Sequence, residues 1–193
     1  MTLDPYYSED ELRSLGARDV GRDTRVSRLA HFYAFTGSIG SRTRIDDHAI
    51  IKGDVQLGRF VHISAFCIIG GAGDTVIMRD FSGVSTHCAV FTATDDYRAS
   101  ALTNPTVPSD MAVIVRGPVE VGFGVVVGAH SMILPNVVIG DGASIGGHAL
   151  VMRNVEPGSI CVPRSGALRI TGHRDVDEIR RRGAEVLAAI GES

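Results

Sequence analysis

Large aliphatic residues recur at every sixth position along most of the chain. Counting in sixes gives three runs, which are Ile39, Ile45, Ile51, Leu57, Ile63 and Ile69, then Met78, Val84 and Val90, and finally Val121, Val127, Ile133, Ile139, Ile145 and Val151. Several of these positions are followed directly by glycine, as at Gly40, Gly58 and Gly70. A strict six-residue period of this kind indicates a repeat architecture.

A second position in the repeat is small. The fourth residue after each aliphatic position is mostly small, as at Thr43, Ala49, Cys67, Ser82 and Ser131. One large and one small residue in every six indicate a chain that turns a corner every six residues, with the large side chain filling the interior. Three hexads make one triangular turn, and turns stack at the strand spacing of about 4.8 Å. The sequence therefore predicts an all-β solenoid, a parallel β-helix of hexapeptide repeats.

The repeat divides the chain into segments. We expect the β-helix over residues 20–156, with an excursion loop at 92–118 where the hexads stop. A long segment without repeats inside a compact domain is usually functional. Residues 1–19 are expected to form an N-terminal capping helix segment, because Ser8 and Glu11 have the spacing of a capping box and Gly16 can end a helix. Residues 157–193 are expected to form a C-terminal tail and helix, and both helices are expected to cover the open ends of the solenoid.

Histidines recur in register with the hexads. Each of four lies three residues after an aliphatic position, and Phe66 occupies the same place in the remaining turn, so the predicted column is His48, Phe66, His87, His130 and His148. A column of imidazoles along one corner favours a binding groove or a subunit interface. The alternative is a set of surface histidines that the repeat merely aligns.

Two histidines are candidate general bases, because an imidazole near its normal pKa accepts a proton at neutral pH. His87 lies one turn before the excursion loop, where Asp95 or Asp96 could fold back and fix its tautomer. His62 is expected to point outward on the neighbouring turn. We also assign His130, Tyr97 and Asn104 to acceptor binding, although a turn role suits Asn104 equally well.

Composition and charge exclude other classes of function. The chain has 193 residues and a formal net charge of −3, which does not suit a nucleic-acid-binding surface. Apolar runs fall short of a membrane span and the first residues do not resemble a signal peptide. The three cysteines, Cys67, Cys88 and Cys161, are unclustered, which is typical of reduced thiols in a cytoplasmic protein. Cys67 and Cys88 occupy the small-residue position, so packing explains both.

Further segments carry a resemblance to a known family. They are VHIS (61–64), DFSGVS (80–85), ATDDYRASALTNPTVP (93–108), RGPVEVG (116–122) and VVVGAHSMILPNVVIGDGASIGG (125–147). With the hexads they resemble the hexapeptide-repeat acyltransferases, whose β-helix is left-handed, and within them the sugar O-acetyltransferases of the galactoside/maltose acetyltransferase group. The resemblance implies acetyl-CoA as donor and a homotrimer with active sites between subunits. It also implies direct attack on the thioester by a hydroxyl that a histidine deprotonates.

The resemblance also implies positions for coenzyme A. The pantetheine channel would run past Ala129, Ser131, Gly147 and Ala149, while Arg164 and Arg169 are candidates for the 3′-phosphate. In well-known members the catalytic histidine lies in the excursion loop, whereas this loop has Asp95, Asp96 and Tyr97 instead. The general base is therefore either His87 or His62. No metal is expected, because the paired histidines of the related carbonic anhydrases are missing.

The function predicted from the sequence is acetyl transfer from acetyl-CoA to a hydroxyl of a sugar or nucleotide sugar. An N-acyltransferase acting on a nucleotide-linked amino sugar is the alternative, since a neutral amine is already nucleophilic and the loop lacks a histidine. A catalytically inactive trimeric binding or scaffold protein is a further alternative.

Overall fold

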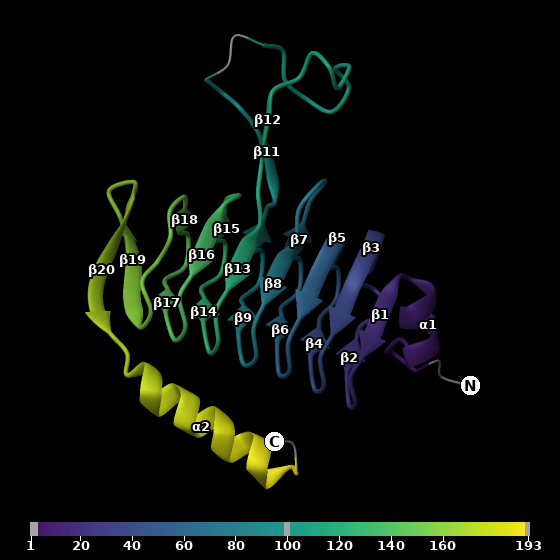
Figure 1. Ribbon diagram of the computed structural model, residues 1–193, viewed down its shortest axis with the longest axis vertical. Coiled ribbons are helices and arrows are strands. Elements are labelled where there is room, and N and C mark those ends of the chain that lie inside the picture. Colours follow the sequence, from purple (N-terminus) through teal and green to yellow (C-terminus); the bar gives the residue numbers. More distant parts are fainter. Residues whose placement is uncertain (1–3, 99–100, 192–193) are drawn as a thin grey trace.

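The computed structural model describes residues 4–98 and 101–191, and most of these residues form one β-solenoid. Figure 1 shows the turns stacked side by side, with α1 (Glu9–Ser14) at one end and a hairpin at the other. The strands of successive turns pair in parallel and in register, as between Ile45 and Ile63 and between Ile63 and Val84. The predicted fold class is confirmed.

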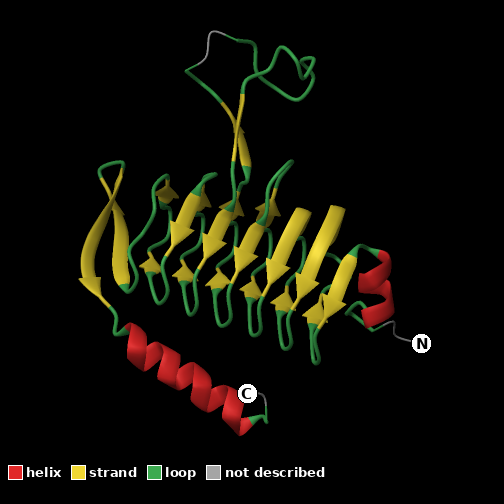
Figure 2. Cartoon of the chain, in the orientation of Figure 1, coloured by secondary structure: helices red, strands yellow, loops and turns green. Residues whose placement is uncertain are grey.

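The strands belong to three sheets, which Figure 2 shows in yellow. The first contains β1 (Ala17–Val20), β3 (His31–Ile39), β5 (Ile50–Leu57), β7 (Ile68–Gly70), β8 (Val76–Met78), β10 (Ala89–Val90), β13 (Val119–Val121), β15 (Met132–Ile133), β16 (Val137–Ile139) and β18 (Leu150–Val151). The second contains β2 (Arg25–Val26), β4 (Arg44–Ile45), β6 (His62–Ile63), β9 (Gly83–Val84), β14 (Val126–Val127), β17 (Ser144–Ile145), β19 (Ser159–Arg164) and β20 (Ala167–His173). The third is the pair β11 (Ala93–Asp95) and β12 (Ile114–Arg116).

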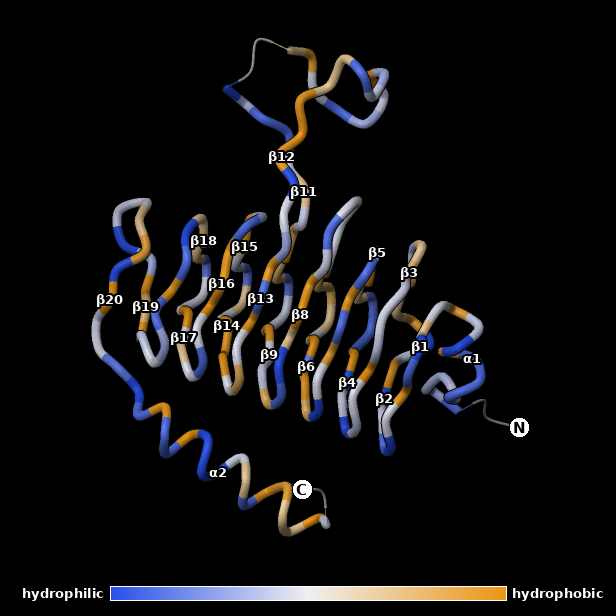
Figure 3. The backbone as a smooth tube through the Cα atoms, in the orientation of Figure 1, coloured by the Kyte–Doolittle hydropathy of each residue, from blue (hydrophilic) through white to orange (hydrophobic). Residues whose placement is uncertain are grey.

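The core is a set of ladders made by the aliphatic positions of the hexads. Ile45, Ile63, Val84, Val127 and Ile145 lie directly above one another and are at most 2% exposed. Figure 3 shows the hydrophobic residues along the strands of the coil. Burying a side chain of this size contributes roughly 1.5–3 kcal/mol, so each ladder stabilises the coil along its length.

One glycine shows why the bends need this residue. Gly70 has φ +104, a conformation that side chains rarely adopt, and a Cβ there would lie 1.9 Å from the carbonyl oxygen of Lys52 on the previous turn. The neighbouring turns therefore approach too closely for any side chain at this position.

The N-terminal helix has the predicted cap. The Ser8 hydroxyl accepts a hydrogen bond from the Glu11 amide, and the Glu11 carboxylate accepts one from the Ser8 amide. Glu11 also pairs with Arg28 at 2.8 Å, and the hydrogen bonds from Arg28 and Ser8 lower the pKa of Glu11 to about 2. Leu12 is 1% exposed, so α1 packs against the first turns of the solenoid.

The C-terminal segment differs from the expectation that its helix covers the open end. The antiparallel hairpin of β19 and β20 lies there instead, and α2 (Val176–Ala189) runs back beneath the solenoid (Figure 1). Gly183 of α2 is buried against the rings of Phe123 and Phe81. A Cβ at this position would lie 2.4 Å from Phe123, so the glycine allows the helix to approach this aromatic corner.

The excursion loop leaves the solenoid through an antiparallel ribbon. Strands β11 and β12 pair Ala93 with Arg116 and Asp95 with Ile114, and the segment between them projects away from the coil (Figure 1). Its side chains are largely exposed, with Tyr97 at 83% and Leu102 at 77%. Apolar side chains this exposed suit contact with another surface.

Candidate active site

The histidine column, defined as His48, Phe66, His87, His130 and His148, forms as predicted. Successive ring centroids lie 5.0, 5.0, 4.8 and 4.9 Å apart, and the planes of His130 and His148 differ by 4°. All five residues have φ between +59° and +61°, because each sits in the left-handed position of the same bend. Stacked bends therefore stack the rings.

His87 is oriented by a hydroxyl, and not by a carboxylate of the excursion loop. The Thr86 hydroxyl donates to the carbonyl oxygen of Ala65 at 2.8 Å, so it can only accept from His87 Nδ1, which lies 2.9 Å away. Neutral His87 consequently carries its proton on Nδ1 and presents Nε2 as the basic nitrogen. The expectation that Asp95 or Asp96 fixes this tautomer is wrong, because Thr86 on the same bend is closer.

His62 is held by an acid on the neighbouring turn. Its Nε2 lies 3.0 Å from the Asp46 carboxylate, which also accepts a 2.5 Å hydrogen bond from Arg44 Nε. Burial raises the pKa of Asp46, but the hydrogen bonds from His62 and Arg44 outweigh burial and leave the pKa below its ordinary value. Asp46 is therefore ionised at neutral pH, and a carboxylate in this position orients an imidazole and stabilises its protonated form.

The two acids of the excursion loop differ in their surroundings. The Asp96 carboxylate accepts hydrogen bonds from the amide and the Nε of Arg98, at 2.9 and 3.2 Å, and these lower its pKa. Asp95 is half-buried at the end of β11, and within residues 4–98 and 101–191 its carboxylate has no hydrogen bond or ion pair. Asp96 thus shapes the loop, while Asp95 is available to bind a ligand.

The other loop candidates have simpler explanations. Tyr97 points into solvent, next to Asp96. Asn104 has φ +126 and accepts hydrogen bonds from the amide and hydroxyl of Thr106 at 2.9 and 2.5 Å, which is the turn role considered for it. Neither residue contacts the histidine column or His62 within the described part of the chain.

Two of the four positions suggested for the pantetheine channel lie inside the solenoid. Ser131 and Ala149 are buried, and the amide of Ala149 donates to the Ser131 hydroxyl. Both occupy the small-residue position, so their side chains point inward, and only their backbone stays a candidate for contact with coenzyme A. Ala129 and Gly147 lie on the surface beside the histidine column and stay candidates.

Arg164 and Arg169 lie on the terminal hairpin. They line a hollow of about 430 Å³ together with Val162 and Thr171. Beside it, a second hollow of about 370 Å³ separates the last turn from the hairpin, and its walls include Leu150, Met152, Arg153, Leu168 and Ile170. An apolar groove flanked by guanidiniums suits a long chain that ends in phosphates.

Two residues were not found from the sequence. Asp46 is sixteen residues from His62, and only the stacking of the turns brings them together. Had the hexads been aligned by turn, the acid one turn before His62 would have been visible. Arg153 could not be identified as a candidate ligand-binding residue, because a single arginine at a bend does not indicate a binding site.

The remaining candidate chemistry is structural. Cys67 and Cys88 are buried and donate to the carbonyl oxygens of Ser85 and Gly128. Among the described residues no cluster of three or more histidine, cysteine, aspartate or glutamate side chains could hold a metal ion. Neither described helix is long and apolar enough to cross a membrane.

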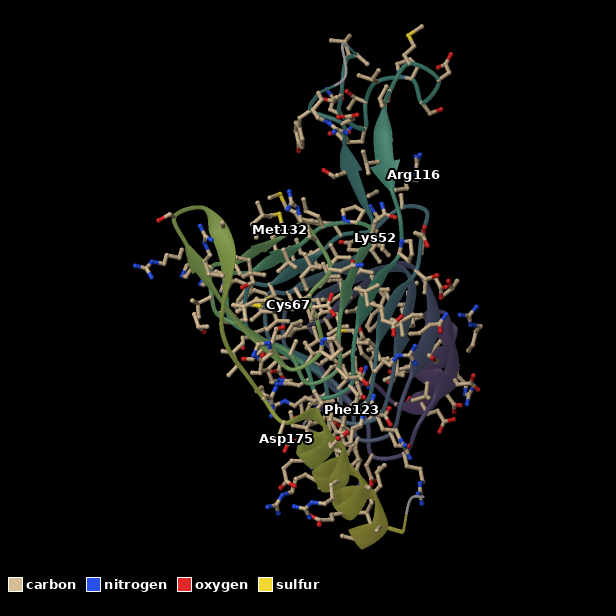
Figure 4. The ribbon with its side chains drawn as sticks, turned by 60° about the vertical axis from the view of Figure 1, so that its left-hand side comes forward. Lys52, Cys67, Arg116, Phe123, Met132 and Asp175 are labelled. Atoms are coloured by element: carbon tan, nitrogen blue, oxygen red, sulfur yellow. The ribbon has the colours of Figure 1, made fainter. Side chains whose placement is uncertain are left out.

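Figure 4 shows Arg116 where the excursion joins the solenoid and Phe123 near Asp175, which caps α2.

The chain is similar to a family and to one characterised relative. Residues 118–153 match the family described as bacterial transferase hexapeptide (six repeats). Over 138 residues the chain is 30% identical to the dTDP-4-amino-4,6-dideoxy-D-glucose acyltransferase of Escherichia coli, a match covering 69% of this chain and 71% of the relative.

Solved structures extend the similarity to the whole fold. AntD, an N-acyltransferase from Bacillus cereus in complex with dTDP and 3-hydroxybutyryl-CoA, superimposes with a TM-score of 0.89 at 32% identity, covering 98% of this chain and 100% of AntD. A serine-to-cysteine variant of AntD in complex with dTDP-4-amino-4,6-dideoxyglucose and coenzyme A gives a TM-score of 0.87 at 31% identity, covering 96% and 99%. AntD has also been solved with one aspartate replaced. AntD is an N-acyltransferase, unlike the galactoside O-acetyltransferases that the sequence resembled.

Proposed function

Because the chain belongs to the hexapeptide-repeat family of acyl-CoA-dependent acyltransferases, we propose that it acylates the amino group of dTDP-4-amino-4,6-dideoxyglucose. The observation that carries the proposal is the match to AntD over nearly the whole of both chains. This is the N-acyltransferase alternative of the sequence analysis, made specific in its acceptor. The donor is an acyl-CoA, with acetyl-CoA and 3-hydroxybutyryl-CoA as the two candidates.

The reaction is a direct transfer. The acceptor nitrogen attacks the thioester carbonyl carbon, the carbon–sulfur bond breaks, and the nitrogen loses one proton while the coenzyme A sulfur gains one. The products are an amide and free coenzyme A. The protein therefore has to bind the amine, accept its proton and place the thioester.

Asp95 is our candidate for binding the amine. An ammonium or amine nitrogen donates hydrogen bonds, and the free Asp95 carboxylate can accept them. Asp96 is already occupied by Arg98, so its role is to hold the loop. This division explains why a loop without histidine suits an amino-sugar acceptor.

His62 is our first candidate for the base and His87 the second. The carboxylate of Asp46 at 3.0 Å stabilises the imidazolium that forms when His62 takes a proton. His87 is oriented as well, but by the Thr86 hydroxyl, which carries no charge. The thioester oxygen gains negative charge during attack, and surface amides near Ala129 and Gly147 are candidates for stabilising it.

The site we propose needs two copies of the chain. His62 lies on the outward face of β6, whereas Asp95 leaves the solenoid from the ribbon that follows β10. An excursion loop that projects from the coil with exposed Tyr97 and Leu102 can reach the face of a neighbouring copy. The homotrimer implied by the family resemblance supplies that neighbour.

Coenzyme A is assigned to the C-terminal end. The apolar hollow beside Leu150 and Met152 would take the pantetheine arm, and Arg164, Arg169 and Arg153 would meet the phosphates. Guanidiniums bind phosphates through paired hydrogen bonds, and these three have no ion pair within the described residues.

Thiol release in the presence and absence of acceptor tests the function. We expect release from acetyl-CoA or 3-hydroxybutyryl-CoA only when dTDP-4-amino-4,6-dideoxyglucose is added, with a product heavier than the acceptor by one acyl group. Release that is independent of acceptor, or none with either donor, contradicts the proposal and favours the scaffold alternative.

A hydroxyl acceptor is the second candidate, and the His62–Asp46 pair favours it. A hydroxyl needs a general base more than a neutral amine does. An imidazole that is hydrogen-bonded to a carboxylate is the usual general base for a hydroxyl. The dTDP-linked sugar with a hydroxyl in place of the amine separates the two functions in the same assay.

A further inference from the structure

One column inside the solenoid contains two neighbouring thiols that the proposed function does not use. The small-residue position of the hexads stacks from turn to turn at this corner, and Figure 4 shows one of its members, Cys67, within the coil. The buried members of the column are Ala30, Ala49, Cys67, Cys88, Ser131 and Ala149. Since alanine and serine fill the other places, packing requires only a small side chain here, and the two sulfur atoms need a further explanation.

The hydrogen bonds of this column do not require sulfur either. The Cys67 thiol donates to the carbonyl oxygen of Ser85 on the next turn at 3.1 Å, and the Cys88 thiol donates to that of Gly128 at 3.2 Å. Ser131 makes the same kind of contact with its hydroxyl, which donates to a carbonyl oxygen of the following turn at 3.2 Å. Serine can therefore replace either cysteine as a hydrogen-bond donor at this position.

Cys67 and Cys88 lie close enough to be joined by a disulfide. The strands that directly follow them, β7 and β10, pair in parallel with Ile68 opposite Ala89, so the two cysteines lie opposite each other, one strand spacing of about 4.8 Å apart. The Cα atoms of disulfides usually lie roughly 4.4–6.8 Å apart. The side-chain hydrogen bond between the two sulfurs lowers the pKa of Cys88 and raises the pKa of Cys67. Cys88 is thus the thiol that ionises more readily, and the thiolate is the reactive form of cysteine.

We propose that Cys67 and Cys88 form a reversible disulfide that switches off the acyl transfer assigned to this chain. The effect on acyl transfer rests on the proposed function, whereas the formation of the bond rests on the two thiols alone. Disulfides that form in reducing compartments are usually transient and serve catalysis or redox sensing.

Hydrogen peroxide is the oxidant that we assign to this reaction. The Cys88 thiolate attacks one oxygen, the oxygen–oxygen bond breaks, and a sulfenic acid forms while the leaving hydroxide takes up the proton that the thiol lost. The Cys67 sulfur then attacks the Cys88 sulfur, the sulfur–oxygen bond breaks, and the oxygen leaves as water with the Cys67 proton. Two thiols and one peroxide thus give one disulfide and two water molecules. Because both thiols are at most 1% exposed, the oxidant reaches them during local opening of the coil, and the reaction is slow.

The disulfide acts on two bends of the candidate site. Ser85 begins the bend that ends at His87, and Gly128 begins the bend that contains Ala129 and ends at His130. Oxidation removes both S–H donors, so the carbonyl oxygens of Ser85 and Gly128 lose these hydrogen bonds. A sulfur–sulfur bond is only about 2.05 Å long, so it also draws the two turns closer together. Ala129, a candidate for contact with the thioester, and His87 are therefore displaced when the bond forms.

Peroxide treatment of the full chain tests the proposal. We expect two of the three thiols to disappear, with peptide mapping showing Cys67 joined to Cys88, and dithiothreitol to restore both thiols. Acyl transfer to the dTDP-linked amino sugar should fall by roughly tenfold in the oxidised chain, because small displacements within a site slow a reaction strongly. Reduction should restore the activity together with the thiols.

Two serine variants complete the experiment. Cys67→Ser keeps a donor for the Ser85 carbonyl oxygen and cannot form the disulfide, so it should match the wild type when reduced and keep its activity after peroxide. The matched control is Cys161→Ser. Cys161 is a single buried thiol of β19, so this variant should form the disulfide and lose activity as the wild type does.

The outcomes separate this inference from the proposed function. If peptide mapping finds no bond between Cys67 and Cys88 after peroxide, the disulfide is wrong. If the bond forms and acyl transfer is unchanged, or if Cys67→Ser loses activity after peroxide as the wild type does, the switch is wrong and the proposed function stands. If the bond forms but the reduced wild type transfers no acyl group, the disulfide stands, and the proposed function fails together with the switch that rests on it.

Discussion

At the scale of single residues, two adjacent acids are expected to differ in effect. Asp95→Asn removes the free carboxylate that we assign to the acceptor amine, so kcat should fall by roughly a hundredfold, within the range for positioned acid–base groups. Asp96→Asn should act less strongly, because it only loosens the contact with Arg98. Steady-state kinetics of both variants measures the difference. Equal losses, or a larger loss for Asp96→Asn, would contradict the assignment.

A second residue-level prediction concerns the histidine that accepts the proton. His62→Ala and Asp46→Asn should each lower kcat, and the double variant should be no worse than His62→Ala, because Asp46 acts through the imidazole. His87→Ala is the comparison, and its smaller loss would agree with His62 as the base. Additive losses for His62 and Asp46 would show that they do not act as a unit.

Sequence reasoning found the histidines and not their partners. His62 and His87 could be identified as candidates because histidine is a titratable residue and each lies at a defined position of the hexad. Asp46 contacts His62 from the neighbouring turn. Thr86 is next to His87 in the chain, but its hydroxyl is made an acceptor by donating to the Ala65 carbonyl of the neighbouring turn, so both tautomers depend on how one turn sits on the next. The inward direction of the Ser131 and Ala149 side chains was equally hard to see, and it leaves only their backbone for the coenzyme A contact that the resemblance implied.

At the scale of elements, the bends set the spacing of the turns. Gly70→Ala should lower the free energy of unfolding by several kcal/mol, because its Cβ would overlap the Lys52 carbonyl as well as strain a φ of +104. Gly166→Ala is the matched control. It has φ +74 but no atom within 4 Å, so only the conformational cost of about 1 kcal/mol should appear.

Chemical unfolding measured by circular dichroism distinguishes the two glycine variants. Similar losses at Gly70 and Gly166 would show that the close approach of the turns contributes nothing.

The helices illustrate what element-level patterns can and cannot predict. The capping box at Ser8 and Glu11 is a local signal and predicts α1 correctly. The apolar stripe of α2 predicts a helix, but its docking place depends on Phe123 and Phe81, which no local pattern connects to Gly183. The hairpin of β19 and β20 was missed because its strands follow no hexad.

At the scale of the whole molecule, the six-residue period was sufficient to predict the solenoid, because each hexad adds the same corner to the coil. The direction of the excursion loop was not predictable, since its course depends on the ribbon at its base. The choice between oxygen and nitrogen as acceptor also needed the relatives, because the hexads specify only the fold.

The two-copy site predicts complementation between inactive variants. His62→Ala and Asp95→Asn should each have strongly reduced activity alone, while coexpression should restore part of the activity, because a mixed oligomer contains one cleft with both intact residues. The control is a chain carrying both substitutions coexpressed with either single variant. If coexpression restores no activity, the two residues act in a site formed by a single chain, which contradicts the two-copy site.

We propose nitrogen as the acceptor atom, and the ratio of kcat/KM for two matched acceptors distinguishes it from oxygen. One is dTDP-4-amino-4,6-dideoxyglucose and the other is the dTDP-linked 6-deoxyglucose with a hydroxyl at the same carbon. We expect a preference for the amine of at least roughly a hundredfold, with an amide as the product. Equal values, or faster transfer to the hydroxyl, would contradict it.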